Sequence, residues 1–396
     1  MANLVMGKFF RRACHLAVAV AAGSFQCAAI CEEHVAPKVS ICMPAKDTEA
    51  YVGAALDSAL NQTLKEIEII CVNDGSTDGT LAILQSYAAK DPRIRVLSNE
   101  TCRGTFYCRM LAILQSTGDY IMWLDSDDEL RSDAAELAHK KAAETGADMV
   151  LYSATGCGAK VGKYNWYETH LPESNRLRNV SELTDFICKG KVSVACWSKL
   201  FRSENMRKMA QCMLPFTEEN NIHKLEDNLL LWYAVKFANT YAVLPLQLYT
   251  YYTDRGKAAT NTANANYQKS ALESVFAIQF KIVADEIDGK DWLRAKRFIE
   301  RQHWNIASHI ERLPQPCCFE TFDTCMSLSR PHFDGKLSST MKRKNKKFFD
   351  GYQKYLKEKE KTEALWKNGP RASADSSTPH RDGAVDQMAE VQLSPI

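Results

Sequence analysis

The sequence has almost no net charge, because 50 lysines and arginines face 48 aspartates and glutamates and leave a formal charge of +2. This balance predicts no nucleic-acid partner and no strongly acidic partner surface, so binding has to arise from local sites. Internal repeats are also lacking, and none of the 14 cysteines forms a CxxC pair. Cysteine spacing therefore predicts no zinc site, and Cys42 and Cys71, which lie in apolar runs, are expected to be buried, reduced thiols.

An uninterrupted hydrophobic run long enough to span a bilayer is missing as well. Residues 1–36 contain a mostly apolar stretch, 13–31, that follows Lys8, Arg11 and Arg12. This layout is typical of a signal peptide or a signal anchor. Polar residues inside the stretch make it marginal as a membrane span, so a peripheral or packed N-terminal helix is the alternative interpretation.

From residue 37 onward, short apolar runs alternate with stretches in which apolar residues recur at helical spacing. The predicted strands are 39–43, 66–72, 94–97, 120–124 and 148–152, and the predicted helices are 49–64, 80–90, 105–116 and 133–144. Farther on, the pattern predicts a strand at 192–201, a helix at 225–237 and a strand at 240–252. Strands and helices in alternation predict an α/β fold with a mostly parallel central sheet and right-handed crossovers.

Polar side chains follow three of the predicted strands at the point where each strand ends. They occupy residues 45–47, 73–75 and 125–128. In a parallel sheet, ligands bind beyond the carboxyl ends of the strands, at the point where the strand order reverses. We therefore expect these three segments to converge at one edge of one sheet.

The acidic cluster Asp125-Ser126-Asp127-Asp128 directly follows an apolar strand. Carboxylates this close repel one another unless a cation neutralises them. Carboxylate oxygens suit Mg²⁺ or Mn²⁺, which usually complete their coordination with water and substrate phosphates. The cluster predicts a metal site, and a solvated turn or helix cap is the alternative.

Asp74 lies in the turn 73–79, which reads NDGSTDG. Its carboxylate could accept a hydrogen bond from the imino group of a nucleobase. The alternative is ordinary turn chemistry, since Asn, Asp and Gly all favour turns.

Four stretches, taken together in this order and spacing, resemble the family 2 glycosyltransferases, which have the GT-A fold. The stretches are VSICMP at 39–44, VNDGSTDGT at 72–80, RGTFYCR at 103–109 and GDYIMWLDSDD at 118–128. The resemblance extends more faintly through WSKLFR at 197–202 and LEDN at 225–228. It implies an inverting transfer of a sugar from a nucleotide-sugar, with Mn²⁺ or Mg²⁺ as cofactor.

The resemblance also implies roles for individual residues. Residues of the nucleotide and donor site would be Pro44, Ala45, Asp47, Asp74, Arg109, Asp125 and Ser126, with Arg109 near the diphosphate. Asp125 and Asp127 match the DxD motif that meets the metal-diphosphate, and Asp227 matches the catalytic base. The resemblance leaves the role of Asp128 in metal and donor binding open.

Other positions are less clearly assigned. Trp197 could stack on an acceptor sugar and Lys199 could meet a phosphate, although a core position is the alternative for Trp197. The chain departs from the family at Lys46 and Asp47, where an aromatic residue and Asn are common, and at Met110, where Asn is usual. These departures put base stacking by that loop in doubt.

The predicted organisation is an apolar segment at 1–36, a GT-A domain at 37–255, a helical region at 256–366 and a disordered tail at 367–396. The predicted partners are a nucleotide-sugar, expected to be UDP-linked, and a glycan or glycolipid acceptor. Scattered cysteines favour a cytoplasmic enzyme with peripheral membrane contact, and a Golgi-type anchor is the alternative for a eukaryotic protein.

Three alternative functions make different demands on the sequence. A nucleotidyltransferase would need a glycine-rich phosphate loop after the first strand, and residues 44–54 do not supply one. A DxD-type phosphatase would carry its acidic pair after the first strand, followed by a Thr, and neither condition holds. A non-catalytic sugar-nucleotide-binding or scaffold protein descended from such enzymes remains the alternative, against which the intact acidic positions argue.

Overall fold

The computed structural model describes residues 36–158, 177–220, 222 and 225–255, with scattered positions between 274 and 299 and position 357. Contacts divide the chain into two units, Met1–Ala36 and Pro37–Ile396, and all elements named below belong to the second. The apolar stretch 13–31, the tail 367–396 and most of the predicted helical region 256–366 lie outside the described residues. None of the described helices is long and apolar enough to cross a membrane.

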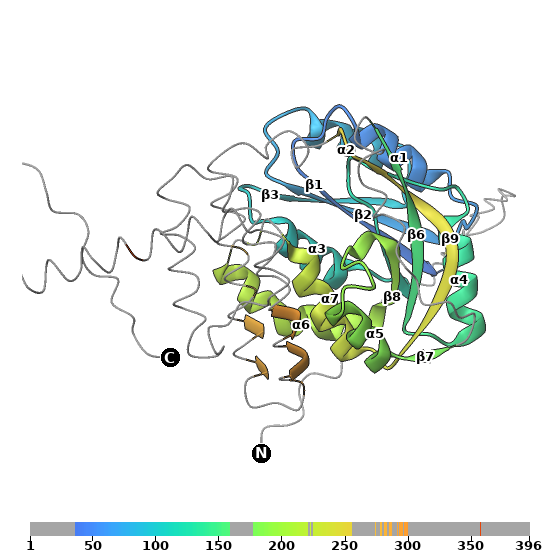
Figure 1. Ribbon diagram of the computed structural model, residues 1–396. Helices are drawn as coiled ribbons and strands as arrows, with labels where there is room; N and C mark the ends of the chain where they lie inside the picture. Colours follow the sequence, from blue (N-terminus) through green and yellow to red (C-terminus); the bar gives the residue numbers. More distant parts are fainter. Residues whose placement is uncertain are drawn as a thin grey trace, which may run out of the picture. The chain divides into compact units, whose positions relative to one another are not determined.

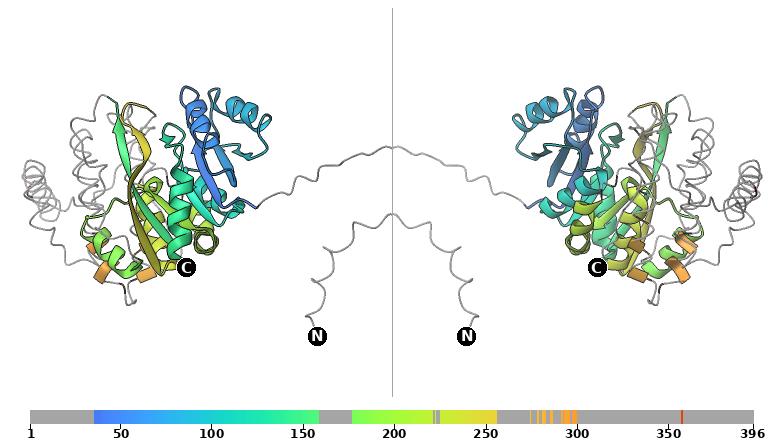
Figure 2. Two further views of the ribbon diagram at one scale, coloured as in Figure 1. Left: turned by 90° about the vertical axis from the view of Figure 1, so that its right-hand side faces the viewer. Right: turned by 90° about the vertical axis from the view of Figure 1, so that its left-hand side faces the viewer.

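A nine-stranded mixed sheet forms the centre of the fold (Figure 1). Its strands are β1 (Val39–Ala45), β2 (Ile67–Asp74), β3 (Ile94–Asn99), β4 (Tyr120–Trp123), β5 (Glu129–Leu130), β6 (Met149–Cys157), β7 (Arg178–Asn179), β8 (Lys199–Arg202) and β9 (Thr240–Tyr252). The strand order is β3-β2-β1-β4-β8-β6-β9-β5, with β7 paired to β9. The first half, β3-β2-β1-β4, is parallel, and β8 enters antiparallel between β4 and β6. Both views in Figure 2 show the long strands β6 and β9 side by side.

Helices cover both faces of the sheet (Figure 1). Their bounds are α1 (Val52–Leu60), α2 (Thr80–Ala88), α3 (Thr105–Gln115), α4 (Ala134–Thr145), α5 (Val180–Cys188), α6 (Ser203–Glu219) and α7 (Glu226–Phe237). Helices α1 and α2 pack together against one face, and α3, α6 and α7 pack together against the other. This is the doubly wound arrangement that right-handed crossovers produce.

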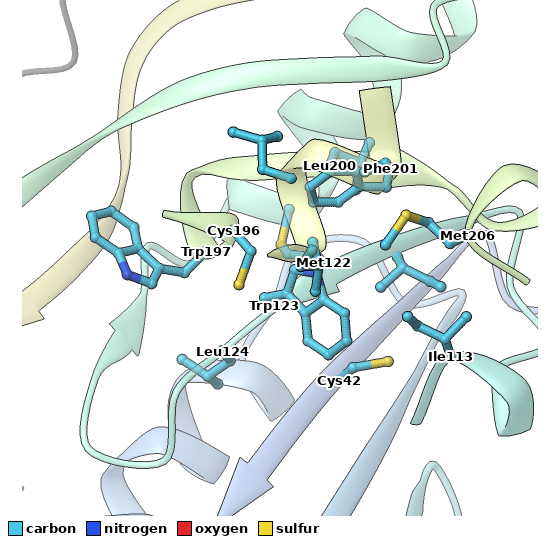
Figure 3. Close-up of a cluster of buried hydrophobic side chains, with 14 of the residues drawn as sticks. Cys42, Ile113, Met122, Trp123, Leu124, Cys196, Trp197, Leu200, Phe201 and Met206 are labelled. Carbon is cyan, nitrogen blue, oxygen red and sulfur yellow. The ribbon is translucent and has the colours of Figure 1, made fainter. Parts of the chain in front are cut away.

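Burial explains why these segments form strands. Every residue of β1, β2 and β4 is buried, as expected for parallel strands that helices cover on both faces. Figure 3 shows the resulting core, in which Met122 and Trp123 of β4 meet Leu200 and Phe201 of β8. The predicted buried thiols, Cys42 and Cys71, are free and buried in β1 and β2 (Figure 3 shows the first).

The strand register brings the carboxyl ends together, as the sequence predicts. Ala45 of β1 pairs with Asn73 of β2, and the backbone N–H of Leu124 donates to the Cys42 carbonyl at 3.1 Å. Side chains then join the segments, because the Lys46 ammonium donates to the Asp74 carbonyl. Segments 45–47, 73–75 and 125–128 therefore meet at one edge of the sheet.

One predicted strand is wrong in its first half. Residues 192–201 do not extend as a strand, because Cys196–Ser198 form a short 3₁₀ helix, η3, and β8 begins only at Lys199. The Lys199 ammonium donates hydrogen bonds to the carbonyl oxygens of Ser193 and Ala195. The backbone bends around it and is not extended. Sequence periodicity carries no signal for such a contact.

Gly104→Ala is expected to destabilise the fold much more than the same change at Gly146. Both glycines have positive φ, +91° and +69°, which an alanine adopts only with strain. A Cβ at Gly104 would also lie 2.6 Å from the Ile222 carbonyl oxygen, whereas one at Gly146 would meet nothing within 4 Å. Urea unfolding should show that the free energy of unfolding falls by about 1 kcal/mol in Gly146→Ala and by at least about 3 kcal/mol in Gly104→Ala. Equal losses would contradict the close approach of the Gly104 and Ile222 backbones.

Candidate active site

The acidic turn begins directly after β4. Asp125 is partly exposed, and its backbone N–H donates to the Tyr249 hydroxyl at 3.1 Å. Ser126 is buried and its hydroxyl accepts a bond from the Thr48 hydroxyl at 3.0 Å, which ties the turn to the loop after β1. The turn is therefore held by partners from two other elements before any ligand binds.

Asp128 anchors this turn to β9. It is 1% exposed, and its two carboxylate oxygens accept bonds from the Tyr249 hydroxyl and the Tyr252 backbone N–H, both at 2.8 Å. Burial and the neighbouring charges of Asp127 and Asp125 raise its pKa well above the ordinary value. The hydrogen bonds of Asp128 thus indicate a structural role for this residue, which the sequence left open. The carboxylates of the turn that would bind a metal are then Asp125 and Asp127.

Arg109 of α3 joins the acidic turn to the start of α7. Its side chain is 2% exposed, and its Nη2 lies 3.0 Å from Asp125 Oδ1, 3.4 Å from Glu226 Oε1 and 3.8 Å from Asp227 Oδ1. The guanidinium also lies over the Trp123 ring, 5.0 Å from its centroid. The resemblance placed Arg109 at the diphosphate, but the structure buries it among three carboxylates. Through these ion pairs, Arg109 links the acidic turn to the start of α7, which lies about a hundred residues farther along the sequence.

The charges around Arg109 do not balance within the site. Burial raises the pKa of Asp125, and the nearby Arg109 cation only partly opposes this. Burial and the charge of Asp227 raise the pKa of Glu226 to about 7. One cation among three acids leaves excess negative charge, which a divalent cation beside Asp125 and Asp127 would offset.

Asp227 is placed by the first turn of α7. Leu225 has φ +58° and precedes the helix, so that Glu226 and Asp227 occupy its first turn, where the helix dipole favours negative charge. The Asp227 side chain is 24% exposed, compared with 13% for Glu226, so Asp227 is the more accessible of the two. Cys196 lies on the other side, where burial raises the pKa of its thiol well above the ordinary value and the nearby charge of Asp227 adds to this rise.

Asp74 does not offer a vacant carboxylate to a nucleobase. Oδ1 accepts from Asn99 Nδ2 and the Arg103 N–H, and Oδ2 accepts from the Cys102 thiol and the Gly104 N–H. Burial alone would raise its pKa, but these bonds outweigh burial and lower it. The predicted contact with a base would have to displace one of them, and the visible function of Asp74 is to shape the 99–104 loop.

The other predicted residues of the base pocket close the loop after β1. Pro44 and Ala45 are buried inside β1. The Asp47 carboxylate accepts the Thr77 N–H at 2.6 Å, and Lys46 Nζ donates to the Gly75 carbonyl at 3.1 Å. Lys46 and Asp47, the two residues that depart from the family pattern, thus connect the loop after β1 to the loop after β2 by hydrogen bonds.

Trp197 and Lys199 are buried in the protein and do not form an exposed acceptor surface. Trp197 is 5% exposed and stacks on the Tyr249 ring, with centroids 4.8 Å apart. Lys199 is 1% exposed, and its ammonium donates to two backbone carbonyls and the Ser198 hydroxyl. The prediction that these residues bind the acceptor is not supported by their positions.

Sequence reasoning missed three residues of this site: Glu226, Tyr249 and Cys196. Glu226 had a signal, since it stands beside Asp227 in the same short motif. The other two had none, because only the fold brings Tyr249 to the acidic turn and Cys196 to Asp227.

Residues 40–209 match the model of the family described as Glycosyl transferase family 2. The chain carries a family 2 glycosyltransferase domain. This domain contains the acidic turn and Arg109, whereas Asp227 lies 18 residues beyond its last matched position. The resemblance seen in the sequence is therefore confirmed.

Three relatives of the glycosyltransferase domain come from bacteria. The chain is 28% identical over 243 residues to the putative glycosyltransferase EpsH of Bacillus subtilis, covering 61% of this chain and 67% of EpsH. It is 28% identical over 173 residues to the glycosyltransferase GlyA of Streptococcus pneumoniae, covering 42% of this chain and 24% of GlyA. It is 41% identical over 108 residues to the chondroitin synthase of Pasteurella multocida, covering 27% of this chain and 11% of that enzyme. The chain thus spans only a minor part of the last two relatives.

The fold of the glycosyltransferase domain agrees with a solved structure. Residues 1–349 of S. aureus TarS, in complex with UDP-GlcNAc, match with a TM-score of 0.52 and 19% identity, over 85% of this chain and 94% of that one. The predicted α/β GT-A fold is therefore confirmed.

Proposed function

We propose that the protein is a metal-dependent, inverting glycosyltransferase that moves a hexose or N-acetylhexosamine from a UDP-sugar to a hydroxyl group on a glycan or glycolipid. One observation carries the proposal: the Arg109 Nη2 lies 3.0 Å from Asp125 and 3.8 Å from Asp227, so the acidic turn and the expected base share one guanidinium. A donor bound at Asp125 would then have a proton acceptor close by.

The residues of the acidic turn fit a divalent cation. Asp125 and Asp127 supply hard oxygen ligands, and both are partly exposed. Within the described part of the chain, no group of three or more acidic, histidine or cysteine side chains could hold a metal ion. Two protein carboxylates suit Mn²⁺ or Mg²⁺ that takes its remaining ligands from a substrate diphosphate and water. When bound, such an ion would stabilise the charge that develops on the departing diphosphate.

The protein's own side chains would contribute the remaining chemistry. The acceptor oxygen forms a bond to C1 of the donor sugar while the bond from C1 to the diphosphate oxygen breaks, which inverts the anomeric centre. Asp227 takes the proton of the acceptor hydroxyl as that bond forms. Arg109 holds Asp227 and Asp125 in a fixed relation, and its cation opposes the rise in pKa that burial imposes on Asp125.

UDP-linked sugars are the first donors to test, because TarS, which shares the fold, was solved with UDP-GlcNAc. The proposed acceptor class is supported by relatives such as the chondroitin synthase of Pasteurella multocida, which this chain matches over 11% of that enzyme's length. The second candidate, a non-catalytic sugar-nucleotide-binding or scaffold protein, would need no accessible base. The partial exposure of Asp227, 24%, favours the enzyme.

A donor screen with the purified full-length chain tests this proposal. UDP- and GDP-sugars are added with Mn²⁺, and the thermal midpoint of unfolding and the release of nucleoside diphosphate are both measured. We expect at least one UDP-sugar to raise the midpoint, since a ligand that binds only the folded state stabilises it. The same donor should yield UDP, and chelation of Mn²⁺ should remove both effects. Binding without release under all conditions would favour the scaffold, and no binding of any donor would overturn both functions.

A further inference from the structure

Lys199 is a buried cation that the proposed mechanism leaves unused. It opens β8, and its side chain is 1% exposed. Its ammonium donates to the Ser193 carbonyl at 2.9 Å, the Ala195 carbonyl at 2.5 Å and the Ser198 hydroxyl at 3.2 Å. An ammonium group has three hydrogens, so these three acceptors use all of them.

These acceptors lie on one short loop, residues 193–198, which includes η3. Further bonds close the loop, since the Ala195 N–H donates to the Ser193 hydroxyl and the Ser198 hydroxyl donates to the Ala195 carbonyl. Tyr152 of β6 fixes its far end by donating its hydroxyl to the Trp197 carbonyl at 2.9 Å. The loop is therefore folded around the Lys199 ammonium.

The first two residues of η3, Cys196 and Trp197, face the two halves of the active site. Cys196 lies close enough to Asp227 that the charge of this carboxylate helps to raise the pKa of its buried thiol. Trp197 stacks on Tyr249, whose hydroxyl accepts the Asp125 N–H. Figure 3 shows the side chains of Cys196 and Trp197 leaving the short helix in different directions. One loop thus supports both the expected base and the metal-binding turn.

We propose that Lys199 is a positioning residue for sugar transfer, whose ammonium group holds the 193–198 loop and thereby fixes Asp227 and the Asp125 turn relative to each other. This inference rests on the proposed function for its catalytic consequence. Its structural half, the hold of the ammonium on the 193–198 loop that carries Trp197, does not depend on that function.

The charge of this ammonium is sensitive to pH in the range where enzymes are assayed. Burial lowers the pKa of Lys199 to about 8, although the electrostatic influence of Cys196 and Asp227 acts to raise it. Among the residues that the structure describes, the Tyr152 hydroxyl also lies nearby, 3.5 Å from the Lys199 carbonyl oxygen. As the pH rises through about 8, the neutral amine keeps only two hydrogens for three acceptors, so the loop is expected to loosen.

The same ionisation has the opposite effect on the stability of the fold. In the unfolded chain a lysine keeps its proton up to a pKa of about 10.4. Between pH 8 and that value the unfolded state binds the extra proton, so this group makes the folded state more stable as pH rises. A loss of activity through this window therefore differs from simple unfolding, which would need stability to fall.

The test compares the wild type, Lys199→Met and the matched control Lys189→Met, which changes an exposed lysine at the end of α5. With the donor found by the screen, kcat/KM of the wild type and of Lys189→Met should fall about tenfold per pH unit above about 8. Lys199→Met should show a kcat at least about tenfold lower, with little change in KM for the donor and no such alkaline limb. A wild-type profile that stays flat from pH 7 to 9.5, or Lys199→Met with wild-type kcat, would overturn the proposal.

A second measurement needs neither turnover nor the Lys199 variant. The near-ultraviolet circular dichroism of the wild type is titrated from pH 7 to 9.5, and Trp197→Phe identifies the part of the signal that comes from the stacked indole. We expect this part to change with a midpoint near 8 in the wild type. A constant Trp197 signal would overturn the inference even if the enzyme is active. A transition without any transfer activity would leave the hold on the loop standing and place the failure on the proposed function.

Discussion

Asp127→Ala is expected to abolish Mn²⁺-dependent binding of UDP while the fold survives. The turn leaves Asp127 partly exposed, whereas both oxygens of Asp128 are committed to β9 and one oxygen of Asp125 is committed to Arg109. No third carboxylate of the turn can therefore replace Asp127. Since even the loss of outer-shell partners of a metal costs 10–100-fold in affinity, losing a ligand should cost more than about 100-fold.

Calorimetric titration of UDP in the presence of Mn²⁺ measures this effect. Asp119→Ala is the matched control, because it makes the same change at an exposed residue just before β4, at the opposite end of the strand. The control should keep wild-type affinity. Mn²⁺-dependent affinity that persists in Asp127→Ala would remove this residue from the metal site.

Asp227→Asn is expected to keep donor binding and lose transfer. The amide has nearly the shape of the carboxylate but cannot take the acceptor proton, and a positioned general base typically contributes about 10²- to 10⁴-fold. Arg109 keeps its contacts with Asp125 and Glu226, so the donor side should hold its geometry. Steady-state kinetics should therefore show kcat reduced by at least about 100-fold with an almost unchanged KM for the donor.

Glu226→Gln separates the two neighbouring acids of α7. It makes the same chemical change at the less exposed carboxyl, which lies 3.4 Å from Arg109. If Asp227 is the base, this variant should lose much less activity than Asp227→Asn. Near-normal turnover in Asp227→Asn, together with a large loss in Glu226→Gln, would move the role of base to Glu226.

The first half of the fold could be predicted from the sequence because its signals are local. Strands β1, β2 and β4 are mostly apolar and buried along their whole length, and the turn after β2 is rich in Gly, Asp and Asn. Observed bounds differ from the predicted ones by a few residues at most sites, as for β1, predicted at 39–43 and observed at Val39–Ala45. Since the carboxyl ends of parallel strands share an edge, the convergence of the polar segments followed directly.

The second half depends on contacts that periodicity does not encode. Helix α6 contains Pro215 and was not predicted, since proline inside a helix normally ends it. Short strands such as β5 and β7 exist because β9 offers them a partner. The loop before β8 folds around a buried lysine, which in the sequence looks like any other lysine.

The sequence motifs indicate which residue types lie near the site but not which neighbours they meet. Asp125 and Asp227 were singled out by motif, and the structure brings both to Arg109. Arg109 itself was assigned to a phosphate, and Trp197 and Lys199 to an acceptor, because the sequence shows which groups are polar or aromatic but not what they face. Burial decides between these roles, and it is a property of the folded chain.

The measurement that bears most directly on the site as a whole is UDP release from a UDP-sugar by the purified full-length protein. It is made with Mn²⁺, with chelator, and with Asp227→Asn under the same conditions. If the acidic turn and Asp227 form one catalytic site, the wild type with Mn²⁺ releases UDP, and chelation and the substitution each suppress that release. Release that continues unchanged under chelation and in Asp227→Asn would contradict a shared site.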